Sequence, residues 1–372
     1  MKIKLLDLFS GIAGFPLGLS QSGFKINKHY TSEIDKHAKA IYKYRFPESI
    51  DIGDVRHVRG GQLDRIDAIT FGSPCQDFSL AGKRKGMDGE RSSLITEAIR
   101  LIDECRPKFF IWENVKGTFS SNNGADFWAI IQAFTNIGGY RLEWQLLNTA
   151  WFLPQNRERI YLVGTLGNES GSEIFPIREK SSGFNERTEQ TPSIRTFTAG
   201  GNSGGMHSSM TLLKVGSIRG RNSENPKSGL KTEQQFEENN KGIANTLTSV
   251  QKDTVLKIKA NTKKGFEEVK PGDSINYSVP TSETRRGRVG KGKAQTLDTA
   301  CNQAVIENTK IRRLTEIECE RLQGFEDNWT QYGIYDDQEK PVPATQRYKC
   351  LGNAVTVDVV QAVGQRIIKT IK

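Results

Sequence analysis

The sequence predicts an α/β fold, in which a Rossmann-like core is interrupted by a smaller, irregular, β-rich domain before the C-terminal segment. Over the first 165 residues, apolar strand-like runs alternate with amphipathic helical runs, the pattern of a parallel sheet covered by helices. After about residue 185 the composition changes to Gly, Ser, Thr, Asn and Lys, and helical periodicity returns only near residue 311. We therefore expect a core domain formed by 1–185 and 309–372, with an inserted domain at 186–308.

Each element of the core is predicted from a short run of residues. The expected strands, in order, are IKLLDLF, HYTSEI, DAITFG, FFIWENV, LEWQLLN and RIYLVGTL. The first helix, FPLGLSQSG, follows a glycine turn, and SSLITEAIRLIDECR repeats apolar residues at helical spacing. DFWAIIQAFTNIGG is a helix that ends at its glycine pair. RRLTEIECERLQGF and VTVDVVQAVGQRIIKTI are the last helices, and we expect the final one to pack back on the core domain.

The composition argues against a membrane or disulfide-rich protein. The chain has 372 residues, 35% of them hydrophobic, and no apolar run approaches the roughly 20 residues of a membrane-spanning helix. The N-terminus lacks the cleavage site of a secretory signal, so we expect a cytoplasmic protein. The five cysteines, at 75, 105, 301, 319 and 350, lack the paired spacing of a zinc site. We expect a monomer with reduced, mostly buried thiols and no metal.

The charge is concentrated in the inserted domain. The net charge is +10, and residues 190–308 contain 18 Lys and Arg against 11 Asp and Glu. This third of the chain therefore holds most of the excess positive charge. A local excess of this kind favours an anionic partner such as nucleic acid.

The first strand leads into a glycine turn. LDLFSGIAGF has Gly11 and Gly14 where the backbone must turn tightly or approach a ligand. Glu33 follows at the end of the next strand, where a carboxylate can accept hydrogen bonds from ribose hydroxyls or can simply cap a helix. The combination is consistent with a nucleoside cofactor.

A second group of polar residues follows other strands of the same predicted sheet edge. Cys75, in GSPCQDFS, comes after DAITFG and is either a nucleophile or an inert core thiol. Glu113 and Asn114 end FFIWENV, and a thiolate beside an acid can add to an electron-poor ring. In QNRER, Arg157 and Arg159 project from one face of an extended segment, either toward a ligand or into solvent.

The inserted domain contains a repeated motif. IRTFTA, ANTLTS and AQTLDT place Thr196, Thr246 and Thr296 at intervals of 50 residues. The last two copies extend further, as ANTLTSVQKDTVL and AQTLDTACNQAVI, which favours an internal duplication.

In their order, these motifs resemble those of the DNA (cytosine-5)-methyltransferases of the bacterial and phage type. DLFSGIAG resembles the family's first motif, SPCQDFS its nucleophile motif, WENV its acid motif, and QNRER its arginine motif. RRLTEIECERLQGF and KCLGNAV resemble the two motifs that follow the family's target-recognition domain. The resemblance covers residues 1 to about 165 and 311–372. It implies an S-adenosylmethionine-dependent methyltransferase fold and duplex DNA with a flipped-out cytosine as substrate.

The resemblance also implies roles for individual residues. Cys75 would attack C6 of the cytosine, Glu113 would engage N3 and the exocyclic amine, and Arg159 would hold O2, supported by Arg157 and Asn114. The cofactor-binding residues would be Phe9, Gly11, Ile12, Gly14, Glu33, Ile34, Asp54, Val55, Pro74 and Asn353. The DNA-binding residues would be Ser79, Lys83, Arg84 and Lys85 in the loop after Cys75, and Arg285, Arg286, Arg288, Lys291, Thr296 and Leu297 in the inserted domain. S-adenosylhomocysteine would be the product.

The nearest alternative is an RNA methyltransferase with the same chemistry, acting on tRNA. A DNA methyltransferase with two recognition units is another alternative, because of the repeated motif, although we favour one recognition domain. A DNA-binding module without catalysis or a nucleotide-dependent oxidoreductase leaves Cys75, Glu113 and Arg159 unexplained. No recognisable motif indicates the target sequence, a companion restriction enzyme or the base that removes the C5 proton.

Overall fold

The computed structural model describes residues 1–72, 92–167, 172–177, 213–221, 233–238, 254–270, 272–278, 287–307 and 310–371. The chain divides into two compact units. Unit 1 comprises Met1–Ser182, Thr296–Cys301 and Thr315–Lys372, and unit 2 comprises Gly183–Gln295 and Asn302–Leu314.

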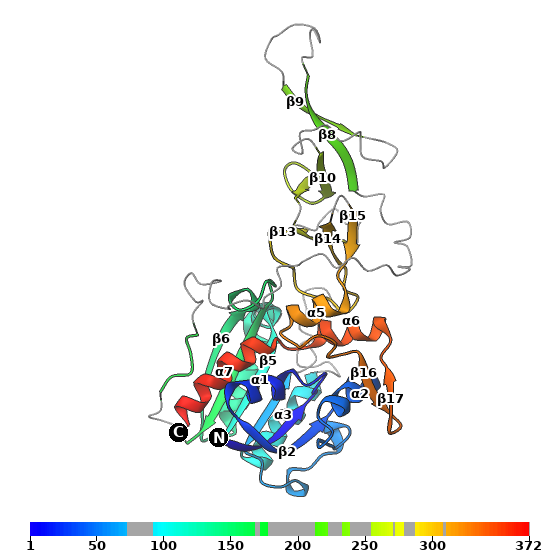
Figure 1. The fold of residues 1–372 in the computed structure, drawn as a ribbon. Coiled ribbons are helices and arrows are strands. Elements are labelled where there is room, and N and C mark those ends of the chain that lie inside the picture. The colour runs from blue at the N-terminus through cyan, green and yellow to red at the C-terminus, as the bar shows by residue number, and fades with distance from the viewer. Residues whose placement is uncertain are drawn as a thin grey trace. The chain divides into compact units, whose positions relative to one another are not determined.

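Unit 1 is built on a seven-stranded sheet with the order β3-β2-β1-β4-β5-β7-β6 (Figure 1). Its strands are β1 (Lys2–Leu8), β2 (Lys25–Ser32), β3 (Ile50–Asp51), β4 (Ala68–Gly72), β5 (Phe109–Val115), β6 (Tyr140–Asn148) and β7 (Glu158–Leu166). Neighbouring strands from β3 to β5 are parallel. The predicted Rossmann-like α/β core is therefore confirmed.

The predicted parallel pairing does not extend to the last two strands. β7 runs antiparallel to β5, and β6 runs antiparallel to β7. The cause is the short connection between Asn148 and Glu158, which holds only a single 3-10 turn, η5 (Thr149–Trp151). A parallel crossover needs about a dozen residues or more, so the chain returns as a hairpin.

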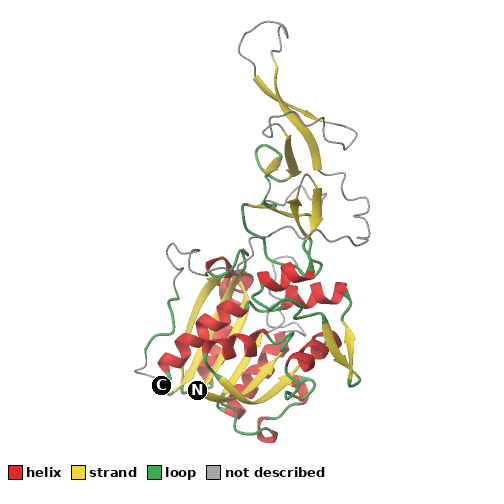
Figure 2. Cartoon of the chain, in the orientation of Figure 1, coloured by secondary structure: helices red, strands yellow, loops and turns green. Residues whose placement is uncertain are grey.

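Helices cover both faces of this sheet (Figure 2). The helices α1 (Gly14–Ser22) and α7 (Val357–Thr370) pack on the face where β1 presents Ile3 and Leu5. The helices α3 (Ser92–Cys105) and α4 (Ala125–Asn136) pack on the opposite face, where β1 presents Leu6 and Leu8. The period of two in the strand thus divides the apolar core into two layers.

Unit 1 contains further short elements. Asp35 is the N-cap of the helix α2 (Lys36–Arg45), and its side chain accepts from the N–H groups of His37 and Ala38. After unit 2 come α5 (Glu316–Leu322), the hairpin β16 (Tyr332–Tyr335) and β17 (Gln338–Pro341), and α6 (Ala344–Asn353). The remaining one-turn elements are η1 (Val55–His57), η2 (Gly60–Gln62) and η4 (Lys116–Gly124).

The described part of unit 2 consists of two four-stranded antiparallel sheets. The first contains β8 (Leu213–Arg221), β9 (Glu233–Glu238), β10 (Thr254–Lys259) and β11 (Phe266–Val269) in the order β11-β10-β8-β9. The second contains β12 (Ser274–Asn276), β13 (Val289–Gly290), β14 (Gln303–Glu307) and β15 (Lys310–Arg313) in the order β15-β14-β12-β13. The two sheets therefore have the same topology, with the fourth strand at one edge and the second at the other.

No helix in the described residues is long and apolar enough to span a membrane. Within the same residues, no cluster of His, Cys, Asp and Glu has the arrangement of a metal site. Of the cysteines described, Cys301, Cys319 and Cys350 are buried, Cys105 is partly buried, and none of the four is in a disulfide.

Candidate active site

The turn between β1 and α1 has an unusual backbone. Phe9, Gly11 and Ala13 all have positive φ angles, of 50°, 54° and 72°. The Ser10 N–H donates to the Ser32 carbonyl at 3.2 Å, which ties the turn to the end of β2. Left-handed conformations at Phe9 and Ala13 are unfavourable for residues with a Cβ atom, so contacts around the turn must maintain them.

Glu33 holds the same turn from the next strand end. Its Oε2 accepts the N–H of Gly11 at 2.9 Å, and its Oε1 accepts the N–H groups of Ile34 and Asp35 at 2.8 and 2.9 Å. A carboxylate offers about four acceptor positions, so three backbone bonds leave capacity for about one more donor. Glu33 can therefore organise the turn and still accept a hydroxyl of a bound nucleoside.

The two glycines of the turn are required for different reasons. Among the described residues, no atom lies within 4 Å of the position that a Cβ atom on Gly11 would occupy, so these residues leave the space in front of this left-handed residue open. A Cβ atom on Gly14 would lie 2.6 Å from a methyl carbon of Val355 and 3.5 Å from Phe325. Gly11 thus leaves room for a ligand, whereas Gly14 allows the C-terminal segment to pack against α1.

The other described residues that were predicted to bind the cofactor differ in their exposure. Phe9 is partly buried against the core, the side chains of Ile12 and Val55 are buried, Asn353 is exposed, and the side chain of Ile34 is 74% exposed. Asp54 follows β3 and is bound by the Arg56 guanidinium, which lowers the pKa of the Asp54 carboxyl to about 2. Asp54 is therefore an ionised acceptor.

Glu113 is the principal acid at the carboxyl edge of the sheet. It is 7% exposed, pairs with Gly72 in the β4–β5 register, and its Oε1 lies 3.2 Å from Nε of Arg159. That Oε1 atom has no hydrogen-bond partner among the residues that the structure describes. A buried carboxylate oxygen without such a partner is costly to maintain and is a common feature of functional sites.

The predicted anchors Asn114 and Arg157 have internal partners. The Oδ1 atom of Asn114 accepts the N–H of Val115 at 2.7 Å. The guanidinium of Arg157 donates to the carbonyls of Gly352 and Ala354 at 3.3 and 2.7 Å. Arg157 therefore links the start of β7 to the GNAV segment, while Arg159 faces Glu113.

The described DNA-binding candidates lie in both units. In unit 1, the Thr296 hydroxyl donates to the Asn156 carbonyl at 2.8 Å, and Leu297 is buried. In unit 2, Arg288 is 3% exposed and donates to the Ser278 carbonyl at 3.1 Å. A DNA contact by Arg288 would therefore require the guanidinium to leave this internal position.

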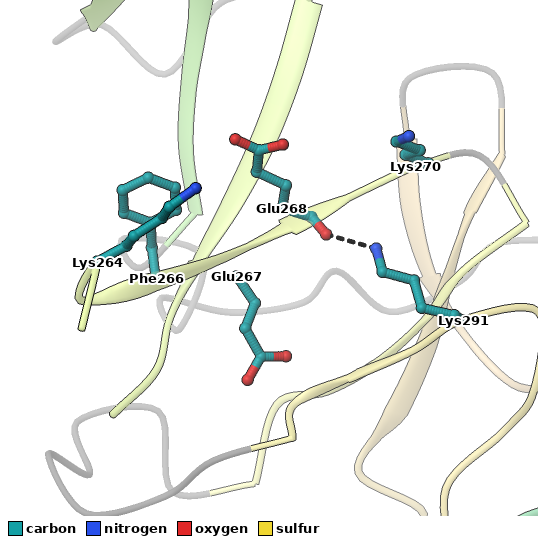
Figure 3. Close-up of a pocket in the computed structure, with 6 residues that line it drawn as sticks. All are labelled: Lys264, Phe266, Glu267, Glu268, Lys270 and Lys291. Carbon is teal, nitrogen blue, oxygen red and sulfur yellow. Dashed lines mark hydrogen bonds between the residues drawn. The ribbon is translucent and has the colours of Figure 1, made fainter. Parts of the chain in front are cut away.

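Lys291 borders a hollow of about 360 Å³ beside β11. Its Nζ atom donates to the Glu268 carbonyl, as Figure 3 shows, and to the Asp273 carboxylate, both at 2.7 Å. Lys264 and Lys270 also line this hollow. Because two acceptors within unit 2 already hold Lys291, a DNA contact by Lys291 would require its Nζ atom to leave these partners.

Several predicted site residues lie outside the described residues. They are Pro74, Cys75, Ser79, Lys83, Arg84, Lys85, Arg285 and Arg286. Thr196 and Thr246 of the repeated motif are also outside.

The structure also draws attention to two residues that were not predicted as site residues. The amide of Gln155 is fully buried, and neither its oxygen nor its nitrogen has a hydrogen-bond partner among the described residues. The position of Gln155 at the start of QNRER was the sequence signal that could have identified it as a site residue. Trp329 donates its indole N–H to the Ile12 carbonyl in the glycine turn, a contact that no local sequence pattern indicates.

Comparison with known proteins places these features in a family. The family model described as "C-5 cytosine-specific DNA methylase" matches residues 3–369. The orphan methyltransferase M.SPRI of Bacillus phage SPR is 27% identical, with 99% of this chain and 98% of that protein covered. The type II methyltransferase M1.ScrFI of Lactococcus lactis subsp. cremoris is 29% identical, with 100% and 79% covered.

Solved structures support the same fold. A putative DNA modification methyltransferase encoded within an E. coli prophage superposes with a TM-score of 0.59 at 20% identity. The alignment covers 99% of each chain. The Entamoeba histolytica methyltransferase EhMeth gives a TM-score of 0.56 at 16% identity, with 99% and 98% covered.

Proposed function

The chain belongs to the C-5 cytosine-specific DNA methylase family, and we propose that it methylates C5 of cytosines within a specific sequence of duplex DNA. One observation carries this proposal. The carboxyl edge of the unit 1 sheet bears both the glycine turn with Glu33 and the buried Glu113–Arg159 pair. Glu113 lies beside Gly72, and Cys75 follows Gly72 by three positions in the sequence.

The glycine turn has the properties required to hold S-adenosylmethionine. The open space at Gly11 admits a ligand close to the backbone, and Glu33 can accept a ribose hydroxyl. Asp54, whose pKa is lowered to about 2 by its contact with Arg56, can accept from the adenine amine. Phe9, Ile34 and Val55 are proposed to border the adenine, with Asn353 completing the site. When bound, S-adenosylmethionine supplies the methyl group.

The proposed chemistry at the cytosine uses a thiolate and a carboxyl group. The Cys75 thiolate forms a bond to C6, and the ring electrons released toward C5 make that carbon the nucleophile. Glu113 engages N3 and the exocyclic amine, and Arg159 holds O2. After C5 is methylated, loss of its proton and breakage of the bond between Cys75 and C6 regenerate the thiolate. A second role is proposed for Arg157, which holds the GNAV carbonyls in place.

Unit 2 is proposed to recognise the target sequence, with Thr296 and Leu297 at its boundary. The shared strand order of its two sheets favours the internal duplication indicated by ANTLTSVQKDTVL and AQTLDTACNQAVI. The strand segments of these two copies fall in the equivalent strands β10 and β14. This equivalence supports a duplication within one recognition domain, and two recognition units remain the alternative.

Bisulfite sequencing of plasmid DNA after incubation with the protein and S-adenosylmethionine tests activity, position and specificity together. We expect cytosines that resist bisulfite conversion, and are therefore methylated, within a single sequence motif. Two unrelated motifs would favour two recognition units. Transfer of tritiated methyl groups to tRNA but not to duplex DNA would refute the DNA assignment in favour of the RNA alternative.

The nucleophile is tested by trapping on DNA that contains 5-fluorocytosine at the target position. The wild-type protein should form an adduct that survives denaturation, because fluorine cannot leave as the C5 proton does. Cys75→Ser should form none. Cys105→Ser is a matched control, since burial raises the pKa of the Cys105 thiol to about 11 and keeps it protonated. An adduct with Cys75→Ser would show that Cys75 is not the nucleophile.

A further inference from the structure

Trp329 connects the C-terminal part of unit 1 to the glycine turn. Its indole Nε1–H donates to the Ile12 carbonyl at 2.9 Å, across 317 positions of the sequence. Trp329 is only 5% exposed, and the bond is buried. A buried carbonyl that loses its donor is left without compensation for its lost hydration.

This bond holds one end of a peptide group whose other end is also held. The carbonyl of Ile12 and the N–H of Ala13 belong to the same planar peptide. The N–H donates to the Ser10 carbonyl at 3.2 Å, and the carbonyl accepts from Trp329. The peptide lies directly before the left-handed Ala13, which is the N-cap of α1 and makes no side-chain capping bond. Both bonds therefore oppose relaxation of an unfavourable φ angle.

The position of Trp329 is itself fixed by contacts on its ring and backbone. The Arg45 guanidinium lies 4.7 Å from the ring centroid, and its Nε donates to the Trp329 carbonyl at 2.8 Å. The Phe325 and Phe46 rings lie 5.3 and 6.4 Å from the Trp329 ring, between centroids. Phe325 also approaches the position that a Cβ atom on Gly14 would occupy. A rigid aromatic cluster thus presents the indole N–H to the turn.

We propose that Trp329 is a positioning residue for the methyl donor, because its indole N–H fixes the Ile12 peptide in the conformation that opens Gly11 toward the donor. The proposal rests on the proposed function, in which this turn binds S-adenosylmethionine. Trp329 acts through Ile12 and contacts no reacting atom.

The substitution Trp329→Phe retains an aromatic ring and removes the donor group. One buried hydrogen bond corresponds to about a tenfold change in an equilibrium constant. We therefore expect the Kd and KM for S-adenosylmethionine to rise about tenfold. The kcat at saturating donor and the KM for DNA should change less than about twofold, since the cytosine site is intact. Trp128→Phe is the matched control, because Trp128 is 63% exposed on α4.

An independent measurement uses the full-length wild-type protein labelled with [15N]tryptophan. The Trp329 indole N–H signal, assigned by its loss in Trp329→Phe, should exchange slowly with deuterium and shift when S-adenosylmethionine is added. The Trp128 signal should exchange rapidly and remain in place. Rapid exchange of the Trp329 indole N–H would overturn the proposal. If Trp329→Phe failed to fold, the Trp329 signal would be assigned with Trp329→Tyr, and the wild-type exchange rate would still test the proposal.

The outcomes separate this proposal from the proposed function. If the wild type methylates DNA and Trp329→Phe has the wild-type Kd for the donor, the positioning role is wrong and the function stands. If the donor binds, Trp329→Phe weakens it and no DNA is methylated, the positioning role stands and the function is wrong. If the wild type does not bind S-adenosylmethionine, both are wrong.

Discussion

The contact between α1 and α7 gives a stability prediction at Gly18. A Cβ atom at this position would lie 2.7 Å from both Cβ and Cγ1 of Val360 and 2.9 Å from the carbonyl oxygen of Val357. Two of these three atoms cannot be moved by rotating a side chain. The substitution Gly18→Ala must therefore separate the two helices or displace α7 on the sheet.

The magnitude follows from two opposing effects. Overpacking of a well-packed contact costs about 1–3 kcal/mol, whereas Ala in place of Gly within a helix stabilises by about 1 kcal/mol. Because two of the three contacted atoms are fixed, the overpacking cost falls in the upper part of its range, about 2–3 kcal/mol. We therefore expect the free energy of unfolding to fall by about 1–2 kcal/mol, and the Tm by about 2–8 °C for a unit of this size. Urea titration and thermal melting, each followed by circular dichroism, measure the two quantities.

Gly61→Ala is the matched control for Gly18→Ala. Within the part of the chain that the structure describes, a Cβ atom at Gly61 would meet nothing within 4 Å, and the φ angle of Gly61 is not in the left-handed region. The free energy of unfolding should change by less than about 0.5 kcal/mol. If Gly18→Ala were as stable as the wild type while Gly61→Ala behaved as expected, the close packing of α1 on α7 would be refuted.

Three further predictions concern other parts of unit 1. Glu113→Gln should lower kcat/KM for DNA methylation by at least about 100-fold, measured by tritium transfer, because it removes an acid and the charge beside Arg159. Burial lowers the pKa of His29 to about 4, so protonation favours unfolding and stability falls as the pH drops from about 6.5 to about 4. Urea titrations should show that the free energy of unfolding falls over that interval by about 2–3 kcal/mol less in His29→Gln than in the wild type. Gly352→Ala, whose Cβ atom would lie 2.6 Å from the Asp298 carbonyl oxygen, should lower the Tm and raise the KM for DNA.

The strands of the core could be predicted because their apolar runs are continuous. FFIWENV, for example, is buried at six of its seven positions in β5, so local composition alone marks it as a central strand. The helices α2 and α6 were not predicted. KHAKAIYKYR and ATQRYKCLGN are largely polar, and each is buried on only one side by residues distant in the sequence. Their apolar positions are too few for periodicity to identify them.

The sequence predicts a set of candidate site residues, but it does not predict the contacts that the described ones make. Gly11 and Gly14 look equivalent in the sequence, yet one faces open space and the other packs against Val355. Similarly, the alternation of Arg157 and Arg159 predicts one shared face, whereas their guanidinium groups have different partners. β7 begins only at Glu158, so the period of two does not extend back to Arg157.

The position of the insertion explains why distant contacts matter for the proposed donor site. Residues 315–372 follow unit 2 in the chain, yet they supply the Trp329 bond to Ile12, the Val355 contact at Gly14 and the carbonyls that hold Arg157. The glycine turn has unfavourable φ angles at two residues other than glycine, Phe9 and Ala13. It therefore depends on contacts from residues at the end of the chain. Closure of such long-range contacts costs chain entropy, which the buried packing of α7 on the sheet must offset. We therefore expect stability at the α1–α7 contact and affinity for the proposed donor to be coupled through this segment.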